Sequence, residues 1–177
     1  MILECAVFRP AGYVGLSRRS SNRAAVMHTN GFATISLFSA WHKRALEGST
    51  KGSHFQVTND GTVEQYVDTD FAIGHAFDAN AFAVGIETQD DGDCHKEWTD
   101  AQITGILAIL FELQVPAQLL EETASDGVGW HRQFDAWNHN NHECPCDQRQ
   151  EQITSVIVPS LAQGSQIKED EWPFLTM

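Results

Sequence analysis

Three residues in this sequence carry donor atoms suited to a transition-metal ion. His28 ends an apolar run, His131 follows Trp130, and Cys144 precedes Pro145. Two imidazoles and one thiolate form an incomplete donor set, the kind that zinc uses when its fourth coordination position stays open for water. If the fold brings the three side chains together, the residues predict a zinc hydrolase.

The region that contains two of these residues is rich in further donors, so a second kind of site must be weighed. The donors between positions 131 and 146 are His131, His139, His142, Cys144 and Cys146. A zinc knuckle would use four of them, but structural zinc sites favour paired spacings such as Cys-x2-Cys, and the region offers one Cys-x-Cys without a second pair. These residues alone therefore indicate a metal site of open type. We interpret His42 and His95 as ordinary surface or hydrogen-bonded histidines.

Hydrophobic periodicity and turn signals predict the elements that must position these residues. We expect strands at residues 24–28, 54–57, 62–67 and 82–87, and a short strand or turn at residues 128–131. Helices are expected at residues 34–46, 99–113 and 147–158. Asp60-Gly61 predicts a hairpin turn, because glycine accepts positive φ angles. Thr99 with Gln102 predicts a capping box, and Pro159 is expected to end the last helix. Because strands and helices alternate without a strict βαβ rhythm, the predicted fold class is α/β, with a central mixed β-sheet flanked by helices.

The length and net charge of the chain limit the kinds of function that it can have. The chain has 177 residues, which suits one domain, and a formal net charge of -13. This charge argues against nucleic acid and anionic lipid as partners, since both require concentrated Lys and Arg. No apolar run reaches the roughly 20 residues of a membrane-spanning helix, so we expect no membrane insertion. The N-terminus shows no signal peptide, which indicates synthesis in a cytoplasm.

The four cysteines are Cys5, Cys94, Cys144 and Cys146, and their spacing follows no regular framework. We interpret them as reduced thiols, at least one of them a candidate metal ligand, and not as disulfide partners. Cys144 and Cys146 are also too close in sequence to bridge each other comfortably.

Several of these motifs occur in an order that points to a known family. In chain order they are His28, Ser53-His54-Phe55, Asp60-Gly61-Thr62-Val63, His75, Val84-Gly85-Ile86-Glu87, Trp130-His131-Arg132 and Cys144-Pro145. The ordered set runs from about His28 to the helix after Asp147 and resembles the type 2 N-acetylmuramoyl-L-alanine amidases. That superfamily includes bacteriophage endolysins and the peptidoglycan recognition proteins. Residues 131–138 further resemble endolysins of actinobacterial phages.

The resemblance implies roles for five residues. His28, His131 and Cys144 match the zinc ligands, and the zinc would lie in a surface groove for glycan and stem peptide. Glu87 matches the acidic position that can serve as the base. His142, two residues before Cys144, matches a position where family members place a Lys or His, and it would help to stabilise the oxyanion.

His54 and Trp130 would line the substrate groove or, equally, pack inside the protein. The resemblance also implies that His75 belongs to the substrate groove. It leaves two readings for His75, which would either contact substrate or hold a zinc ligand in place. Two positions depart from the family pattern. Cys146 stands where the family usually has glycine, and we interpret it as a small residue after the turn and not as a competing ligand. Ser53 stands where many phage members carry a catalytic tyrosine, so Glu87 is the expected base.

By this resemblance the chain is expected to be a phage endolysin that hydrolyses the amide bond between N-acetylmuramic acid and L-alanine in peptidoglycan. Residues 1–160 would form the amidase catalytic domain and residues 161–177 an acidic C-terminal tail. We expect a monomer that is held in the cytoplasm of a host bacterium before its release to the cell wall. The alternative is a non-catalytic or regulatory peptidoglycan-binding module of the same fold.

Overall fold

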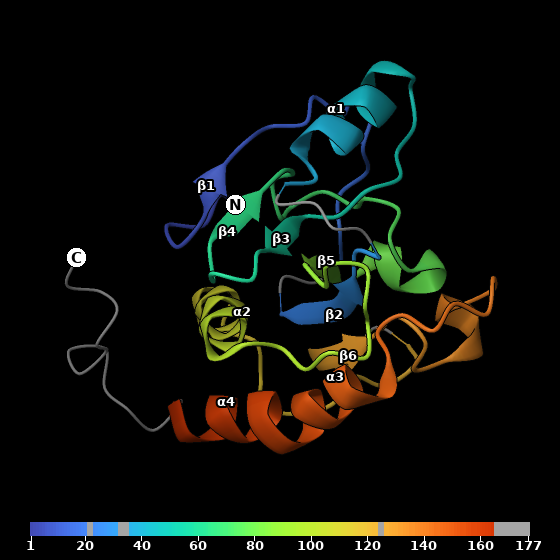
Figure 1. Ribbon diagram of the computed structural model, residues 1–177. Coiled ribbons are helices and arrows are strands. Elements are labelled where there is room, and N and C mark those ends of the chain that lie inside the picture. Colours follow the sequence, from blue (N-terminus) through green and yellow to red (C-terminus); the bar gives the residue numbers. More distant parts are fainter. Residues whose placement is uncertain (21–22, 32–35, 124–125, 165–177) are drawn as a thin grey trace.

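Six β-strands form one sheet in the order β1-β4-β3-β5-β2-β6 (Figure 1). The computed structural model describes residues 1–20, 23–31, 36–123 and 126–164 of the chain. The strands are β1 (Val7–Phe8), β2 (Ala24–Thr29), β3 (Phe55–Val57), β4 (Val63–Gln65), β5 (Val84–Thr88) and β6 (Gly127–Trp130). The α-helices are α1 (Phe38–Leu46), α2 (Asp100–Glu112), α3 (Asp147–Gln152) and α4 (Val158–Gly164). Two short 3₁₀ turns and one π-helical turn complete the elements: η1 (Phe77–Ala81), η2 (Asp135–Trp137) and η3 (Ile153–Ile157).

The sheet is mixed, as the sequence predicts. Strands β3, β5, β2 and β6 run parallel to one another, whereas β4 is antiparallel to β3 and pairs in parallel with β1 at the outer edge. The predicted hairpin joins β3 to β4, and Gly61 in its turn has a φ of 86°. Residues with a Cβ atom rarely adopt this angle, so glycine is required at the turn. The predicted fold class, a central mixed sheet flanked by helices, is confirmed.

The two faces of the sheet carry different layers. Along β2, Ala25 and Met27 pack into a core with α2 and the C-terminal helices, whereas Ala24 and Val26 pack into a core with η1 and η2. Because successive strand residues point to opposite faces, this alternation places His28 on the face of Ala24 and Val26. Figure 1 shows α2 and α4 side by side on one side of the sheet and α1 on the opposite side.

Helix α2 begins with the predicted capping box. Oγ1 of Thr99 accepts a hydrogen bond from the backbone N–H of Gln102 at 3.1 Å, and Oε1 of Gln102 accepts one from the N–H of Thr99 at 3.1 Å. These two bonds satisfy backbone donors that the first turn of a helix leaves unpaired. Helix α1, expected from residue 34, begins at Phe38, and positions 34 and 35 lie outside the described residues.

The prediction for the last helix is wrong at its C-terminal end. Pro159 does not stop the helix, because the backbone stays helical through Gly164. Proline lacks an N–H group, and its ring clashes with the carbonyl four residues earlier in a regular α-helix. The π-helical turn η3 ends two residues before Pro159 and widens the helix there, which makes room for the proline ring. Leu161 is buried in the core beyond the expected boundary at residue 160, and residues 165–177 of the expected tail lie outside the described residues.

The interpretation of all four cysteines as reduced thiols is also wrong. Cys94 and Cys146 form a disulfide across 52 residues of sequence, whereas Cys5 and Cys144 are free. Their spacing gives no sign of the pair, because the loop after β5 and the start of α3 meet only in the folded chain. Cys146 is therefore a covalent tie and not a small residue after a turn.

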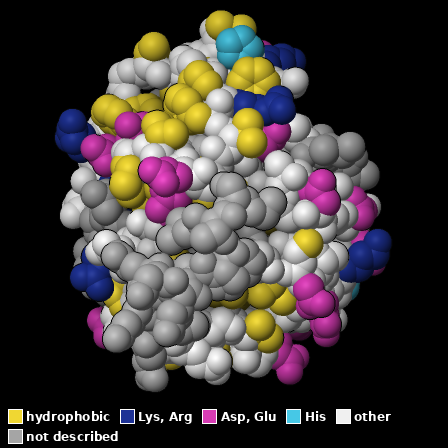
Figure 2. Space-filling model, turned by 90° about the vertical axis from the view of Figure 1, so that its left-hand side faces the viewer, with side chains coloured by type: hydrophobic (Ala, Val, Ile, Leu, Met, Phe, Trp, Pro, Cys, Tyr) yellow, Lys and Arg dark blue, Asp and Glu magenta, His cyan; other side chains and the backbone are white. Residues whose placement is uncertain are grey.

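The surface agrees with the acidic composition. Acidic side chains are spread over the face of the molecule shown in Figure 2, and hydrophobic side chains gather in its upper part. The edge strand β1 exposes two hydrophobic side chains, Val7 at 52% and Phe8 at 42%. Within the described part of the chain, no helix combines the length and the apolar composition that crossing a membrane requires.

Candidate metal centre

The carboxyl ends of three neighbouring parallel strands bring candidate residues to one place. His28 lies near the end of β2, Glu87 is aligned with it on β5, and His131 directly follows β6. The N–H of His131 donates to the carbonyl oxygen of Met27 at 3.2 Å, which continues the β2–β6 pairing by one residue. Sheets with parallel strands commonly bind ligands at this edge. The fold thus gathers three predicted site residues that lie far apart in sequence.

Cys144 completes the group from the loop before α3. The ligand atoms of His28, His131 and Cys144 all lie within 4.8 Å of one another. Sγ of Cys144 lies 3.7 Å from Nδ1 of His28. A nitrogen and a sulfur ligand on one tetrahedral zinc ion are separated by roughly 3.6 Å, so this distance suits shared coordination. The backbone N–H of Thr29 donates a hydrogen bond to Sγ at 3.2 Å, which fixes the side chain and favours the thiolate.

Hydrogen bonds through His75 determine which nitrogen of His28 can face a metal. Nε2 of His75 lies 3.0 Å from the carbonyl oxygen of Ala83 and must donate, because a carbonyl oxygen only accepts. Nδ1 of a neutral His75 is then an acceptor, and it accepts from Nε2 of His28 at 3.1 Å. Nδ1 of His28 keeps its lone pair on the side of Cys144. Of the two readings of His75, holding a ligand in place fits these contacts, because both of its ring nitrogens are already bonded.

Burial keeps these histidines uncharged. The pKa of His28 lies well below its ordinary value because of burial, with the charges of His131 and His75 adding to the shift. Burial also lowers the pKa of His75 to about 3, against the opposing hydrogen bond to Ala83. Burial and the charge of His142 lower the pKa of His131 to about 4. A neutral imidazole is the form that binds a metal ion, so the rings are ready to act as ligands at neutral pH.

Two buried polar atoms at the site have no hydrogen-bond partner among the described residues: Nε2 of His131 and Oε2 of Glu87. An unpaired buried group costs about 1–3 kcal/mol, and native structures keep few of them. Burial, followed by the charge of Glu87, raises the pKa of the Cys144 thiol. A divalent cation would give His131 a partner and supply the positive charge that releases the thiol proton. The residues present therefore fit a zinc ion held by His28, His131 and Cys144.

Glu87 is placed to act beside this donor set. Its alignment with His28 across β2 and β5 means that both side chains project to the same face of the sheet. Burial raises the pKa of Glu87 to about 7, with the charge of Asp90 adding to the shift and that of Arg44 opposing it. A carboxyl group with a pKa near neutrality can both accept and release a proton, as general acid–base catalysis requires.

The sequence of residues 18–147 matches the N-acetylmuramoyl-L-alanine amidase family. The chain belongs to this family. The match covers every strand from β2 to β6 and includes all three candidate metal ligands. A comparison with curated proteins finds no match.

Solved structures show the same fold. The N-acetylmuramoyl-L-alanine amidase LysC from Clostridium intestinale is 17% identical, with a TM-score of 0.58 over 92% of this chain and 99% of its own. The Drosophila peptidoglycan recognition protein SA is 18% identical, with a TM-score of 0.58 over 85% of this chain and 92% of its own. At such identities the likeness supports the architecture and not the activity.

One candidate groove residue of this amidase-family chain is fully buried. His54 is 0% exposed, its Nε2 lies 2.8 Å from the carbonyl oxygen of Phe71, and its Nδ1 accepts from the N–H of Gly85 at 3.0 Å. Of the two readings of His54, packing fits these contacts, because the buried ring ties β5 to the loop that follows β4. Trp130 is half-buried and packs against the core, and its role in a groove stays a prediction.

His142 lies at the exposed rim of the site. Its ring centroid is 6.2 Å from that of His131. The side-chain amide of Asn138 holds the backbone of His142 twice, donating to its carbonyl oxygen and accepting from its N–H, both at 2.9 Å. A pocket of about 390 Å³ opens here, and its walls include Thr29, Asp90, Cys94, His142 and Cys144. This pocket reaches one of the three candidate ligands, Cys144, beside the rim residue His142.

Sequence reasoning missed Arg149, which supports the site from α3. The side chain is 1% exposed, and its guanidinium donates to Oγ1 of Thr29 at 2.9 Å and to Oγ1 of Thr88 at 2.8 Å. It thereby fixes the residue whose N–H holds Cys144. One local signal would have found it, since Arg149 falls on the apolar stripe of the last helix with Ile153 and Ile157. Thr29 and Asn138, the other missed residues, act through partners that no local pattern indicates.

Proposed function

We propose that this chain is a zinc-dependent N-acetylmuramoyl-L-alanine amidase that hydrolyses the amide bond between N-acetylmuramic acid and L-alanine in peptidoglycan. The observation that carries the proposal is the convergence of His28, His131 and Cys144 within 4.8 Å, a donor set with one coordination position open. Membership of the amidase family supports the same reaction. A module that only binds peptidoglycan would have no use for an unpaired buried imidazole nitrogen and a partly buried thiol arranged around a cation site.

When bound, zinc would act as a Lewis acid on the scissile carbonyl group and lower the pKa of water. Glu87 would accept a proton from the attacking water on Oε2, the atom without a hydrogen-bond partner in the described chain, and pass it to the leaving amine. His142, held at the rim by Asn138, would donate a hydrogen bond to the oxyanion. His75 would keep the lone pair of His28 directed at the ion.

The biological role that we propose is that of a monomeric phage endolysin. It would be made in the cytoplasm of the host bacterium and reach the wall through a membrane opening made by another protein. Among solved structures of this fold is an endolysin amidase from Clostridium intestinale, 19% identical with a TM-score of 0.57. Expression in a bacterium with and without a pore-forming partner tests the role. Lysis that needs no such partner would contradict this route to the wall.

The activity is tested by mass spectrometry of peptidoglycan fragments after incubation with the purified protein. We expect release of stem peptides that begin with a free L-alanine amine, and loss of that release when a chelator removes zinc. With the Cys94–Cys146 disulfide intact, Cys144→Ser should lose both zinc and activity, and Glu87→Gln should retain zinc and lose most turnover. Cys5→Ser, which changes an exposed cysteine remote from the site, is the matched control. Fragments that are bound but left intact would support the binding module instead.

A further inference from the structure

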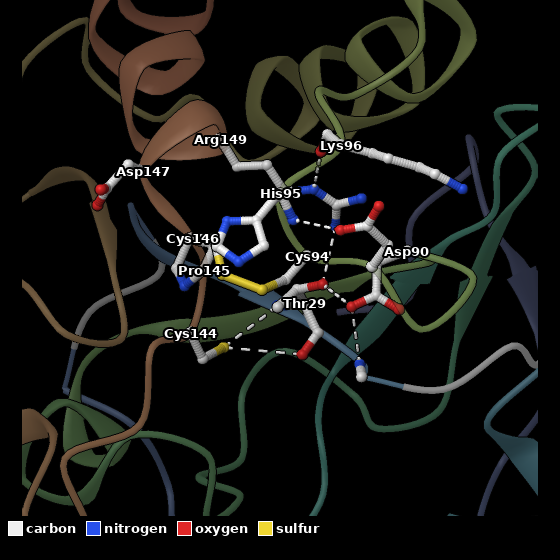
Figure 3. Close-up of a disulfide and its surroundings, with 12 residues drawn as sticks. Thr29, Asp90, Cys94, His95, Lys96, Cys144, Pro145, Cys146, Asp147 and Arg149 are labelled. Carbon is white, nitrogen blue, oxygen red and sulfur yellow. Dashed lines mark hydrogen bonds between the residues drawn. A yellow bond between two sulfur atoms is a disulfide. The ribbon is translucent and has the colours of Figure 1, made fainter.

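A second group of metal-binding side chains lies beside the candidate zinc centre. The ligand atoms of Cys94, His95 and Cys146 lie within 4.8 Å of one another. The two sulfur atoms are joined as a disulfide, and Figure 3 shows the imidazole of His95 next to them. We propose that these three residues form a second site for a zinc-class divalent cation, which becomes available when the disulfide is reduced. The site shares no ligand with the proposed amidase centre and does not depend on the proposed function.

The donor types and their spacing suit zinc. Two thiolates and one imidazole are the ligands that structural and catalytic zinc sites share. Two sulfur ligands on a tetrahedral zinc ion lie roughly 3.8 Å apart. The Cα atoms of Cys94 and Cys146 are 5.5 Å apart, so rotation of the side chains about χ1 gives this separation without movement of the backbone.

The loop that carries Cys94 and His95 is held in place without the disulfide. The guanidinium of Arg149 donates to the carbonyl oxygen of Gln89 at 3.1 Å and to that of Lys96 at 2.9 Å, which anchors both ends of the loop to α3. Within the loop, the N–H of His95 donates to the carboxylate of Asp93 at 3.1 Å. None of these bonds involves sulfur, so reduction leaves Cys94 and His95 next to Cys146.

Cys146 is equally fixed on the other side. It is the N-cap residue of α3, and its carbonyl oxygen accepts from the N–H of Arg149 at 3.1 Å and from that of Gln150 at 3.2 Å. The preceding carbonyl, that of Pro145, accepts from side-chain atoms of Gln150 at 2.8 Å and Arg132 at 3.1 Å. The three donors are therefore preorganised, and a cation would find them together.

Charge and access also favour a cation. Carboxylates of the same loop, Asp90, Asp91 and Asp93, are close enough to act on the charge of Arg149 at the start of α3. The chain as a whole carries -13, so the surrounding potential attracts positive ions. Cys94 is part of the wall of the pocket of about 390 Å³, through which ions and reductants can reach it.

The chemistry balances with a phosphine reductant. The disulfide takes up two electrons and two protons to give two thiols, while the phosphine takes oxygen from water and becomes a phosphine oxide. Binding of the cation then releases both thiol protons, because thiolates are the ligands. In a reducing compartment a dithiol would do the same work and become a disulfide itself. The metal ion would thus replace the disulfide as the link between the loop and α3.

The experiment isolates the second site by removing the first. The Cys144→Ser chain is prepared in oxidised form and in phosphine-reduced form, without air, and its zinc content is measured by native mass spectrometry. We expect one zinc per reduced chain and none per oxidised chain. With cobalt in place of zinc, the reduced chain should show sulfur-to-metal charge-transfer absorption, which reports thiolate ligands. Zinc should also raise the Tm of the reduced chain and leave that of the oxidised chain unchanged.

Second substitutions in the Cys144→Ser chain identify the ligands. Cys94→Ser should weaken zinc binding by the reduced chain roughly a hundredfold or more, and His95→Ala at least roughly tenfold. Lys96→Ala, the exposed neighbour, and Cys5→Ser are the matched controls and should bind as the parent does. Equal zinc content before and after reduction would overturn the proposal. So would zinc binding that survives Cys94→Ser, because Cys146 would then have joined His28 and His131 instead.

Discussion

The ring of His75 packs directly on the backbone of Gly85, so that a Cβ atom added to Gly85 would lie 2.6 Å from Cγ of His75. This contact is shorter than carbon atoms tolerate. Gly85 lies in the middle of β5, where glycine weakens a strand and usually marks the close approach of another group. The glycine therefore makes room for the imidazole that orients His28.

Gly85→Ala should displace the His75 ring and destabilise the protein. We expect the free energy of unfolding to fall by about 1–3 kcal/mol, as overpacking of a core commonly does. Urea unfolding measures this change. The control is the double variant Gly85→Ala with His75→Ala, in which the alanine replaces the clashing ring. If the two substitutions destabilise additively, the contact between these residues is not the cause.

His75→Ala should reduce zinc affinity, because Nε2–H of His28 would lose its acceptor and the ring its fixed orientation. Loss of such an outer contact weakens metal binding roughly 10- to 100-fold. Competition with a chromophoric chelator measures the Kd. His75→Asn places an amide oxygen near the position of Nδ1 and should restore much of the affinity. Equal affinity in the alanine variant and the wild type would show that the hydrogen bond does not orient His28.

Glu87 should give the metal-free protein a specific pH dependence of stability. Its pKa rises from the ordinary 4.5 to about 7 on folding. Between these values the folded chain holds more protons than the unfolded chain, so this group's contribution to stability falls as pH rises from about 4.5 to about 7. Glu87→Gln removes the contribution. The stability of the variant relative to the wild type should therefore increase across this window and then level off.

Buried histidines shift stability in the opposite direction, so only the difference between the two proteins isolates Glu87. The pKa values of His28, His75 and His131 are lowered on folding, which makes stability rise with pH up to about their ordinary 6.5. These residues are present in both proteins. Urea unfolding at a series of pH values, with a chelator present, gives the difference. A difference that does not change with pH would show that Glu87 titrates normally in the fold.

Arg149→Met should destabilise the fold and weaken the metal site together. The substitution removes the side-chain donor of the Lys96 carbonyl oxygen and one of the two side-chain donors of the Gln89 carbonyl oxygen, which keeps Gln102. It also frees Thr29, whose N–H holds Cys144. A hydrogen bond to a charged group contributes about 1.5–3 kcal/mol, and several are lost together, so we expect a loss of about 3 kcal/mol in the free energy of unfolding.

The control for Arg149→Met is Lys43→Met, which removes one positive charge from a side chain that is 78% exposed. It should change the free energy of unfolding by less than about 0.5 kcal/mol. Zinc affinity of both variants is measured with the same chelator competition. If Arg149→Met loses stability and keeps its zinc affinity, the guanidinium stabilises the fold and does not support the metal site.

Local chemistry in the sequence determined most of the elements. A short apolar run predicted β2, Asp60-Gly61 predicted the hairpin, and Thr99 with Gln102 predicted the start of α2, because each signal acts within a few residues. The ordered motifs also pointed to His28, His131 and Cys144, which the structure brings together. The predicted elements rest on residue type and spacing, whereas the ligand set rests on the resemblance of the ordered motifs to a known family.

Contacts between distant residues decided the rest. Thr29 and Cys144 are 115 residues apart, His28 and His75 are 47 apart, and the two halves of the disulfide are 52 apart. Hydrogen bonds and a disulfide depend on distance and direction in space, and residue types carry neither for partners that lie so far apart. For this reason the sequence leaves two readings for His54 and does not pair Cys146 with Cys94. The tertiary structure alone shows that His75 orients His28 and that Arg149 anchors the loop after β5.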